Sequence, residues 1–197
     1  MPPTLVSGIV LAGGRSSRFG ADKLAADYRG QPLLHHAVLR VAEVCHDVIV
    51  VLAPGADGAG LPPGVRTAND ATEGEGPLAG LHTGLMAAVR SDVVVVVGGD
   101  MPDLQPAVLR EMVRVLDDAG VDAVALADGE RARPLPCVLR TWPAADMTHT
   151  LLHAGRRRLR DVLDALRIAV IDEPTWTALD PGRRTVFDVD EPGDLTE

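Results

Sequence analysis

The chain has 197 residues, a length at which a single domain is expected. Apolar residues make up 46% of the chain and aromatic residues only 3%, so the core must consist mainly of Val, Leu and Ala. This composition favours a buried sheet covered by helices over an aromatic-rich β-sandwich. The formal net charge of −9 argues against general binding of nucleic acid, whose phosphates need a basic surface.

Apolar, β-branched runs alternate along the chain with stretches of helical periodicity. Strands are predicted at 4–12, 47–53, 64–70, 92–100, 121–127, 134–140 and 168–172, and helices at 32–45, within 72–91, at 104–120, 143–153 and 158–166. For 184–197 a short strand followed by an acidic turn is predicted. Strands and helices that alternate at this spacing predict an α/β fold with a mostly parallel central sheet.

Cysteine usage and the N-terminal residues indicate a compartment. Cys45 and Cys137 lie far apart, outside any C-x-x-C spacing, which suits buried thiols in a reducing environment. The apolar run at the N-terminus follows no cationic segment, and no stretch reaches the ~20 apolar residues of a membrane span. We therefore expect a cytoplasmic protein without membrane contact.

Three chemically distinctive segments follow predicted strands. They are Gly13-Gly14, Asn69-Asp70 and Gly98-Gly99-Asp100. In parallel α/β sheets, ligands bind outside the carboxyl ends of the strands. If the three strands are adjacent and parallel, these segments meet at one edge of the sheet and form an active site.

The segment LAGGRSSRFGADK, residues 11–23, has the composition of a phosphate-binding loop. Its glycines let backbone N–H groups approach an anion, and Arg15, Arg18 and Lys23 add positive charge. The spacing is neither G-x4-G-K-[ST] nor G-x-G-x-x-G. A phosphate-binding loop of another type is predicted, and a glycine turn with solvated charges is the alternative.

Carboxylates near the predicted edge suit a hard cation. Asp100 follows five valines and two glycines at the tip of a central strand, where it could hold Mg²⁺. The alternative for Asp100 is to cap the helix that follows, a role for which Asp103 is better placed. Asp188 and Asp190 lie two apart, so one of them could be a second metal ligand, unless both belong to an exposed acidic terminus.

Other polar residues carry weaker hypotheses. Asp70 could accept hydrogen bonds from a nucleobase or ribose, or hold a turn. His149 and His153 have the i, i+4 spacing of a zinc pair, but no third ligand is evident nearby in the sequence, so a solvated helix face is expected. The basic run Arg156–Arg160 could grip an anion or a partner protein, or simply be solvated.

Motifs along nearly the whole chain resemble those of nucleotidyltransferases that attach a nucleoside monophosphate to molybdopterin. LAGGRSSRFGADK is similar to their signature L-x-G-G-x-S-x-R-[MF]-G-x-D-K. The resemblance continues, in order, through GQPLLHHA, EGPLAGL, GGDMP, DGERARPLP, AGRRRL and FDVDEPGDL. GPLAGL points more narrowly to the molybdenum cofactor guanylyltransferases.

The resemblance implies a Rossmann-like, three-layer nucleotidyltransferase fold in one domain spanning 1–197. A nucleotide-binding half would cover about 1–103 and an acceptor-binding half about 104–197. It implies transfer of GMP from GTP to molybdopterin, with Mg²⁺ as cofactor and pyrophosphate as second product. A transient contact with a cofactor-delivery protein or a molybdoenzyme is also implied.

The same resemblance assigns roles to matching residues. Leu11, Ala12, Gly13 and Gly14 would contact the nucleotide, Lys23 its phosphates, and Arg18 the pyrophosphate leaving group. Asp70 would help to read the guanosine, Asp100 would hold the metal, and Asp190 would be a second metal ligand. Arg131 and Arg133 would lie on the pterin side.

Two departures from the guanylyltransferase pattern keep the base preference open. Leu52 stands where these enzymes carry an asparagine that contacts the nucleotide, and DVDEPGD replaces N-x-N-T-P-E near the C-terminus. Aspartates at the latter position are common in the cytidylyltransferase relatives. A CTP-dependent or sugar-phosphate-type nucleotidyltransferase is therefore the first alternative, and a non-catalytic nucleotide-binding module is the second.

Overall fold

The computed structural model describes residues 4–13, 23–58, 60–70 and 76–196. Within them, seven strands form one sheet in the order β5-β4-β1-β6-β8-β7-β9. The strands are β1 (Val6–Leu11), β4 (Asp47–Leu52), β5 (Arg66–Asn69), β6 (Val93–Gly98), β7 (Ala123–Asp128), β8 (Arg131–Arg140) and β9 (Ile168–Ile171). β8 pairs antiparallel with β6 and β7, and the other four pairings are parallel. The predicted mostly parallel sheet is confirmed.

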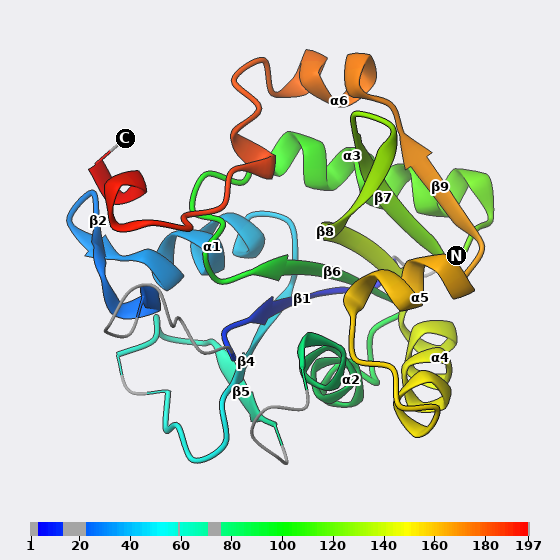
Figure 1. Ribbon diagram of the computed structural model, residues 1–197, viewed down its shortest axis with the longest axis horizontal. Helices are drawn as coiled ribbons and strands as arrows, with labels where there is room; N and C mark the ends of the chain where they lie inside the picture. Colours follow the sequence, from blue (N-terminus) through cyan, green and yellow to red (C-terminus); the bar gives the residue numbers. More distant parts are fainter. Residues whose placement is uncertain (1–3, 14–22, 59, 71–75, 197) are drawn as a thin grey trace.

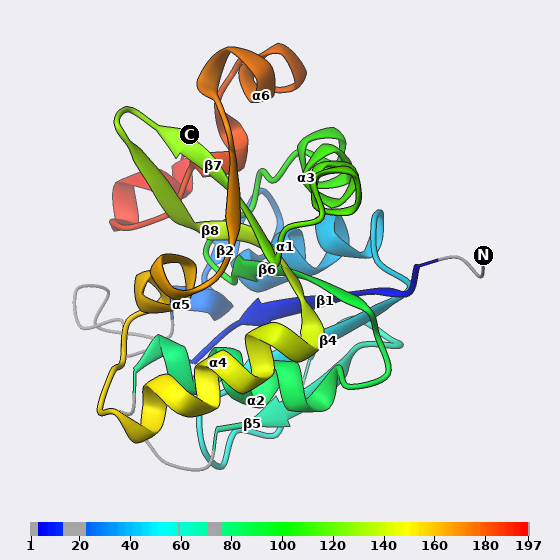
Figure 2. The ribbon, with the colours of Figure 1, turned by 90° about the vertical axis from the view of Figure 1, so that its right-hand side faces the viewer.

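Helices cover both faces of the sheet and complete three layers (Figures 1 and 2). The helices are α1 (Leu33–Ala42), α2 (Pro77–Ala87), α3 (Pro106–Ala119), α4 (Thr141–His153), α5 (Leu159–Ala165) and α6 (Glu173–Leu179). Side chains of α1, α3 and α6 share one core with Val10, and those of α2, α4 and α5 share the other with Ile9. Successive residues of a strand point to opposite faces, so β1 and the fully buried valines of β6 contribute to both cores.

Helix α2 packs unusually close to the sheet. A Cβ atom placed on Gly84 would lie 2.6 Å from Cγ2 of Ile9, nearer than two carbon atoms can approach. On Gly80, one turn earlier, the same atom would meet its nearest neighbour at 3.4 Å, which is ordinary contact. Glycine at position 84 therefore sets the distance between the helix and β1.

The structure corrects some expectations about local structure. The strand predicted after residue 184 does not form; 3-10 helices occur at Arg184–Val186 and Pro192–Thr196 instead. Two short strands, β2 (Asp27–Tyr28) and β3 (Gln31–Pro32), were not predicted, and neither was α6. Strands of two residues and a helix of seven are too short to show a period in the sequence.

Both cysteines are buried, as expected, and burial raises the pKa of each thiol to about 12. Among the described residues, no helix is long and apolar enough to cross a lipid bilayer.

Candidate active site

Hydrogen bonds between strand ends bring the predicted nucleotide-binding segments to one edge of the sheet. The amide of Gly99 donates to the carbonyl oxygen of Leu11 (3.0 Å), and the amide of Ala12 donates to Val51 (2.8 Å). The amide of Asp70 donates to Leu52 (3.1 Å) at the end of the neighbouring strand. The predicted convergence of these segments is confirmed for the described residues. Gly14, Arg15 and Arg18 lie outside the described residues.

Gly13 lies at the point where the chain leaves β1. A Cβ on it would lie 3.6 Å from the backbone nitrogen of Ala53, in ordinary contact. Gly13 itself is exposed, so a ligand's phosphates can approach the main chain at this position.

Lys23 lies between two of the predicted carboxylates. Its Nζ is 2.9 Å from Oδ2 of Asp100 and 3.7 Å from Oδ1 of Asp190. The lysine side chain is only 10% exposed, whereas those of Asp100 and Asp190 are 33% and 66% exposed. A buried ammonium thus faces two carboxylates that are open to solvent.

The C-terminal segment reaches this edge through one backbone hydrogen bond. The amide of Val189 donates to the carbonyl oxygen of Asp100 at 3.0 Å. Asp188 accepts a hydrogen bond of 2.6 Å from Nη2 of Arg133, and Nη1 of the same arginine donates to Asp128 at 3.1 Å. Arg133, one of the two arginines expected on the pterin side, is therefore held by two carboxylates.

Asp188 joins Asp100 and Asp190 in an acidic cluster. Burial raises the pKa of Asp188 above its ordinary value, and the guanidinium of Arg133 opposes this. The negative charges of Asp100 and Asp190 raise the pKa of Asp188 further, because a third charge is unfavourable among like charges. Such a cluster gains stability from a bound cation.

The chemistry of this cluster fits Mg²⁺ held jointly with a nucleotide. Carboxylate oxygens are hard ligands, and Mg²⁺ in phosphoryl-transfer sites is bound through one or two carboxylates together with substrate phosphates and water. Within the described part of the chain, no group of three or more His, Cys, Asp or Glu side chains could hold a metal alone. The site therefore suits a metal that arrives with its substrate.

Asp70 points toward α2 from the end of β5. Its Oδ1 accepts a hydrogen bond of 2.9 Å from the hydroxyl of Thr83, and its Oδ2 lies near Gly80. The neighbouring Asn69 donates to the carbonyl oxygens of Ala53 and Ala56 and so holds the loop that follows β4. The side chain of Asp70 is thus fixed on the α2 side of the edge.

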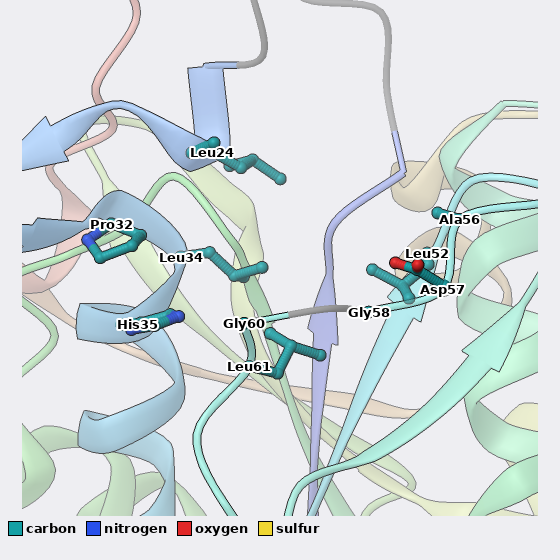
Figure 3. Close-up of a pocket in the computed structure, with 11 residues that line it drawn as sticks. Leu24, Pro32, Leu34, His35, Leu52, Ala56, Asp57, Gly58, Gly60 and Leu61 are labelled. Carbon is teal, nitrogen blue, oxygen red and sulfur yellow. The ribbon is translucent and has the colours of Figure 1, made fainter.

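An apolar cavity of about 250 Å³ lies on the α1 side of the same edge (Figure 3). Leu24, Leu34, Leu52 and Leu61 surround it, and His35 and Asp57 add polar atoms. Leu52 is only 8% exposed and belongs to the core on the α1 face. Leu52 thus packs in the core and also lines one side of the cavity.

Asp103 has a role that the sequence analysis missed. Helix α3 begins at Pro106 after Gln105, so Asp103 is not its N-cap. The Asp103 carboxylate instead accepts hydrogen bonds from Tyr28 (2.9 Å) and Arg29 (3.0 Å), and from two nitrogens of Arg184. It therefore connects three segments behind the active-site edge. The signal available in the sequence was a carboxylate close to the GGD turn, but its partners are 74 to 81 residues away.

Comparison with known proteins agrees with this geometry. The model of the MobA-like NTP transferase domain matches residues 8–170. The chain belongs to this family. The family match covers residues 8–11 of β1, all of β4, β5 and β6, and helices α1 to α5, and it ends before α6 and the C-terminal segment.

Proteins related in sequence align with most of the chain. A probable molybdenum cofactor guanylyltransferase of Chloroflexus aggregans is 32% identical and covers 97% of this chain and 92% of its own. A probable molybdenum cofactor guanylyltransferase of Mycobacterium tuberculosis is 36% identical over 87% of both chains. The molybdenum cofactor guanylyltransferase of Desulfosudis oleivorans is 30% identical over 89% of this chain and 85% of its own.

Solved structures share the fold. Molybdopterin-guanine dinucleotide biosynthesis protein A of Archaeoglobus fulgidus matches with a TM-score of 0.81 at 23% identity, covering 96% of this chain and 95% of its own. A 4-diphosphocytidyl-2C-methyl-D-erythritol synthase of Anaerococcus prevotii matches with a TM-score of 0.73 at 14% identity, covering 98% and 93%. Because proteins named for guanine and for cytidine products share this fold, the fold alone does not show which nucleotide base is used.

Proposed function

We propose that this member of the MobA-like family is a molybdenum cofactor guanylyltransferase: it transfers GMP from GTP to molybdopterin and releases pyrophosphate. The observation that carries the proposal is the cluster of Lys23, Asp100 and Asp190 beside the turn after β1. The names of the relatives, which are 30–36% identical over most of the chain, support guanylyl transfer in particular.

The reaction breaks one bond and forms another at the α-phosphorus of GTP. An oxygen of the terminal phosphate of molybdopterin attacks this phosphorus, and the bond to the bridging oxygen breaks so that pyrophosphate leaves. No nucleophilic side chain is required, and the protein accelerates the step by positioning its reactants and neutralising developing charge. A cationic side chain flanked by carboxylates at a glycine turn suits this task.

Asp100 and Asp190 are the residues that would hold Mg²⁺, which would supply positive charge at the phosphate oxygens. The ammonium of Lys23 donates hydrogen bonds to the triphosphate, and Arg18 neutralises the leaving pyrophosphate. Leu11, Ala12 and Gly13 contact the nucleotide. This division of roles keeps the charged groups on the phosphates.

Asp70 completes the proposed nucleotide site on the α2 side of the edge. Its Oδ1 accepts from Thr83, which fixes the carboxylate at the edge where it would bind an N–H or O–H of guanosine. By this proposal the nucleotide occupies the half at about 1–103, and molybdopterin reaches it from the half at about 104–197. The protein would act in the cytoplasm and receive molybdopterin from a delivery protein.

A CTP-dependent enzyme is the alternative that two departures from the guanylyltransferase pattern leave open, although the names of the relatives do not favour it. Asp188 and Asp190 replace the asparagines of the guanylyltransferase pattern, and Leu52 is buried in the apolar cavity. A non-catalytic nucleotide-binding module fits less well, because Lys23 and Asp100 keep their catalytic chemical types and lie 2.9 Å apart.

The deciding experiment compares nucleotides in both binding and turnover. Purified protein is titrated with GTP, CTP, ATP and UTP, each with and without Mg²⁺, and its melting temperature is followed, since a ligand of the native state raises it. Pyrophosphate release is then measured with molybdopterin present and absent. We expect stabilisation by GTP with Mg²⁺, and release only with molybdopterin. Stabilisation led by CTP would assign a cytidylyltransferase, and nucleotide binding without release would assign a non-catalytic module.

A further inference from the structure

Three histidines and one arginine line a cavity of about 310 Å³ between α2 and α4. His82 comes from α2, His149 and His153 from α4, and Arg157 from the segment that follows α4. The ring centroids of His149 and His153 are 4.3 Å apart, and those of His82 and His149 are 6.0 Å apart. His149 and His153, the pair singled out in the sequence, thus gain a third imidazole from α2, much earlier in the chain.

Hydrogen bonds fix the tautomers of two of these rings. The hydroxyl of Thr148 donates to the carbonyl oxygen of Ala145 at 2.9 Å, so its oxygen accepts from Nδ1 of His82, also at 2.9 Å. Nδ1 of His153 donates to the carbonyl oxygen of His149 at 3.0 Å. In each ring Nδ1 therefore carries the first proton, and Nε2 gains an N–H group on protonation.

The charges around the cavity are positive or neutral. His82 is the only ionisable side chain on α2, and on α4 the only carboxylate is Asp146, one turn before His149 and outside the cavity lining. In the next segment, Arg156 is paired with Asp161 at 2.7 Å. The described lining residues include no carboxylate.

The surroundings of His82 disfavour its protonated form. Burial lowers the pKa of His82, and the neighbouring His149 and His153 lower it further, because protonated rings would repel each other. Nη1 of Arg157 donates to the carbonyl oxygens of Leu152 and Arg156, which holds the guanidinium at the cavity. A permanent positive charge therefore stands beside three groups that can each add another.

An anion suits this arrangement better than a metal ion. The guanidinium of Arg157 repels cations, and within the described residues no group of three or more His, Cys, Asp or Glu side chains has the placement to hold a metal. A tetrahedral oxyanion would accept hydrogen bonds from the guanidinium and from the Nε2–H groups of protonated rings. We infer that the cavity is a second anion site, separate from the nucleotide site, that binds a phosphate-type dianion of the size of phosphate or pyrophosphate.

Backbone contacts place this cavity next to the first turn of α2. The carbonyl oxygen of Arg157 accepts a hydrogen bond of 3.2 Å from the amide of Leu78. Gly76, which precedes α2, has a φ of +84°, and a Cβ on it would lie 3.0 Å from that same carbonyl oxygen. An anion bound to Arg157 therefore lies beside Gly76 and the first turn of α2.

Sulfate is the sharpest probe, because it stays a dianion throughout the neutral range while the histidines titrate. Titrations followed by the ring ¹H–¹⁵N signals of His82, His149 and His153 report binding at this cavity and avoid the general stabilisation that sulfate gives proteins. We expect these signals to shift, the ring pKa values to rise when sulfate binds, and the affinity for sulfate to fall about tenfold or more from about pH 6 to pH 8, because histidine side chains lose their positive charge over this range. Binding that does not depend on pH would overturn the inference.

Four variants localise the site. Arg157→Gln and His153→Gln change exposed side chains and leave the backbone bond to Leu78 in place, and each should weaken sulfate binding about tenfold or more. Arg160→Gln, in the same basic run but outside the cavity, is the matched control and should change it less than about twofold. If Lys23→Met removes the sulfate effect while Arg157→Gln keeps it, the anion binds in the nucleotide site and the proposal is wrong.

Titrations with phosphate, pyrophosphate and Zn²⁺ define the class of ligand that the cavity binds. Phosphate and pyrophosphate, compared at one pH, should both compete with sulfate, and the tighter of them identifies the size that the cavity accepts. Zn²⁺ is titrated in parallel. Ring shifts with Zn²⁺ but none with any of the three anions would show a metal site and overturn the inference.

Discussion

The amide of Val189 donates a 3.0 Å hydrogen bond to the carbonyl oxygen of Asp100, and this bond fixes the C-terminal segment at the end of β6. Its two neighbours then meet different partners. Asp190 lies 3.7 Å from Nζ of Lys23, and Asp188 accepts from Arg133 at 2.6 Å. One backbone contact thus assembles an acidic cluster from residues nearly 90 positions apart in the chain.

Asp100→Asn should reduce turnover about 100-fold, or about 2.7 kcal/mol of transition-state stabilisation, because the amide removes a negative charge that would hold the metal against the phosphates. Initial rates over a range of Mg²⁺ concentrations measure this loss. Asp164→Asn, an exposed change on α5, is the control and should keep the wild-type rate. A nearly unchanged rate in Asp100→Asn would remove this residue from the metal site.

Lys23→Met should have opposite effects on two ligands. Loss of the ammonium removes charge-assisted hydrogen bonds and should weaken GTP binding about 10- to 100-fold, with little change for guanosine. Without nucleotide, Mg²⁺ should bind the variant more tightly, because the lysine no longer neutralises Asp100 and Asp190. Calorimetric titrations with GTP, guanosine and Mg²⁺ give the three affinities. Equal losses for GTP and guanosine would show that Lys23 does not contact phosphate.

Asp103→Asn should destabilise the protein by about 3 kcal/mol near neutral pH, because it leaves the buried hydroxyl of Tyr28 and the half-buried guanidinium of Arg184 poorly paired. Burial raises the pKa of Asp103, but hydrogen bonds from Arg184 and Tyr28, together with the charges of Arg184 and Arg29, outweigh it and lower the pKa overall. Folding stability from this carboxylate is therefore fully present above its unfolded pKa of about 3.9 and is lost as pH falls through the lower folded pKa.

Urea unfolding of wild type and Asp103→Asn at several pH values tests this dependence. The difference in the free energy of unfolding should stay constant from about pH 5 to pH 8 and shrink below about pH 4. A difference that instead grows toward low pH would contradict a lowered pKa for Asp103.

Gly84→Ala should cost about 1–3 kcal/mol, because its Cβ meets Ile9 at 2.6 Å and forces α2 away from the sheet. Gly80→Ala provides the matched control on the same helix. It gains the same helix propensity, about 1 kcal/mol, and its nearest contact is 3.4 Å, so its stability should be unchanged or higher. Urea unfolding measures both, and equal stabilities for the two variants would show that α2 adjusts freely.

The sequence alone determined the elements whose period and burial are strong. Five consecutive valines predicted β6, the apolar run before Gly13 predicted β1, and Gly120 ends α3 in the left-handed conformation expected of a C-cap. Because the residues after such strands share one edge, Asp70 and Asp100 could be placed at the site without coordinates.

Only the tertiary structure decided the contacts between distant segments. From the local sequence, Asp103 could be interpreted as a helix cap. Its carboxylate instead accepts hydrogen bonds from three residues, one in β2, one in the adjoining turn and one in the C-terminal region. His149 and His153 had no third imidazole until the packing of α2 on α4 brought His82 beside them. The physical reason is that periodicity reports which face of an element is buried, whereas the partner of a polar side chain depends on which elements the closed chain places together.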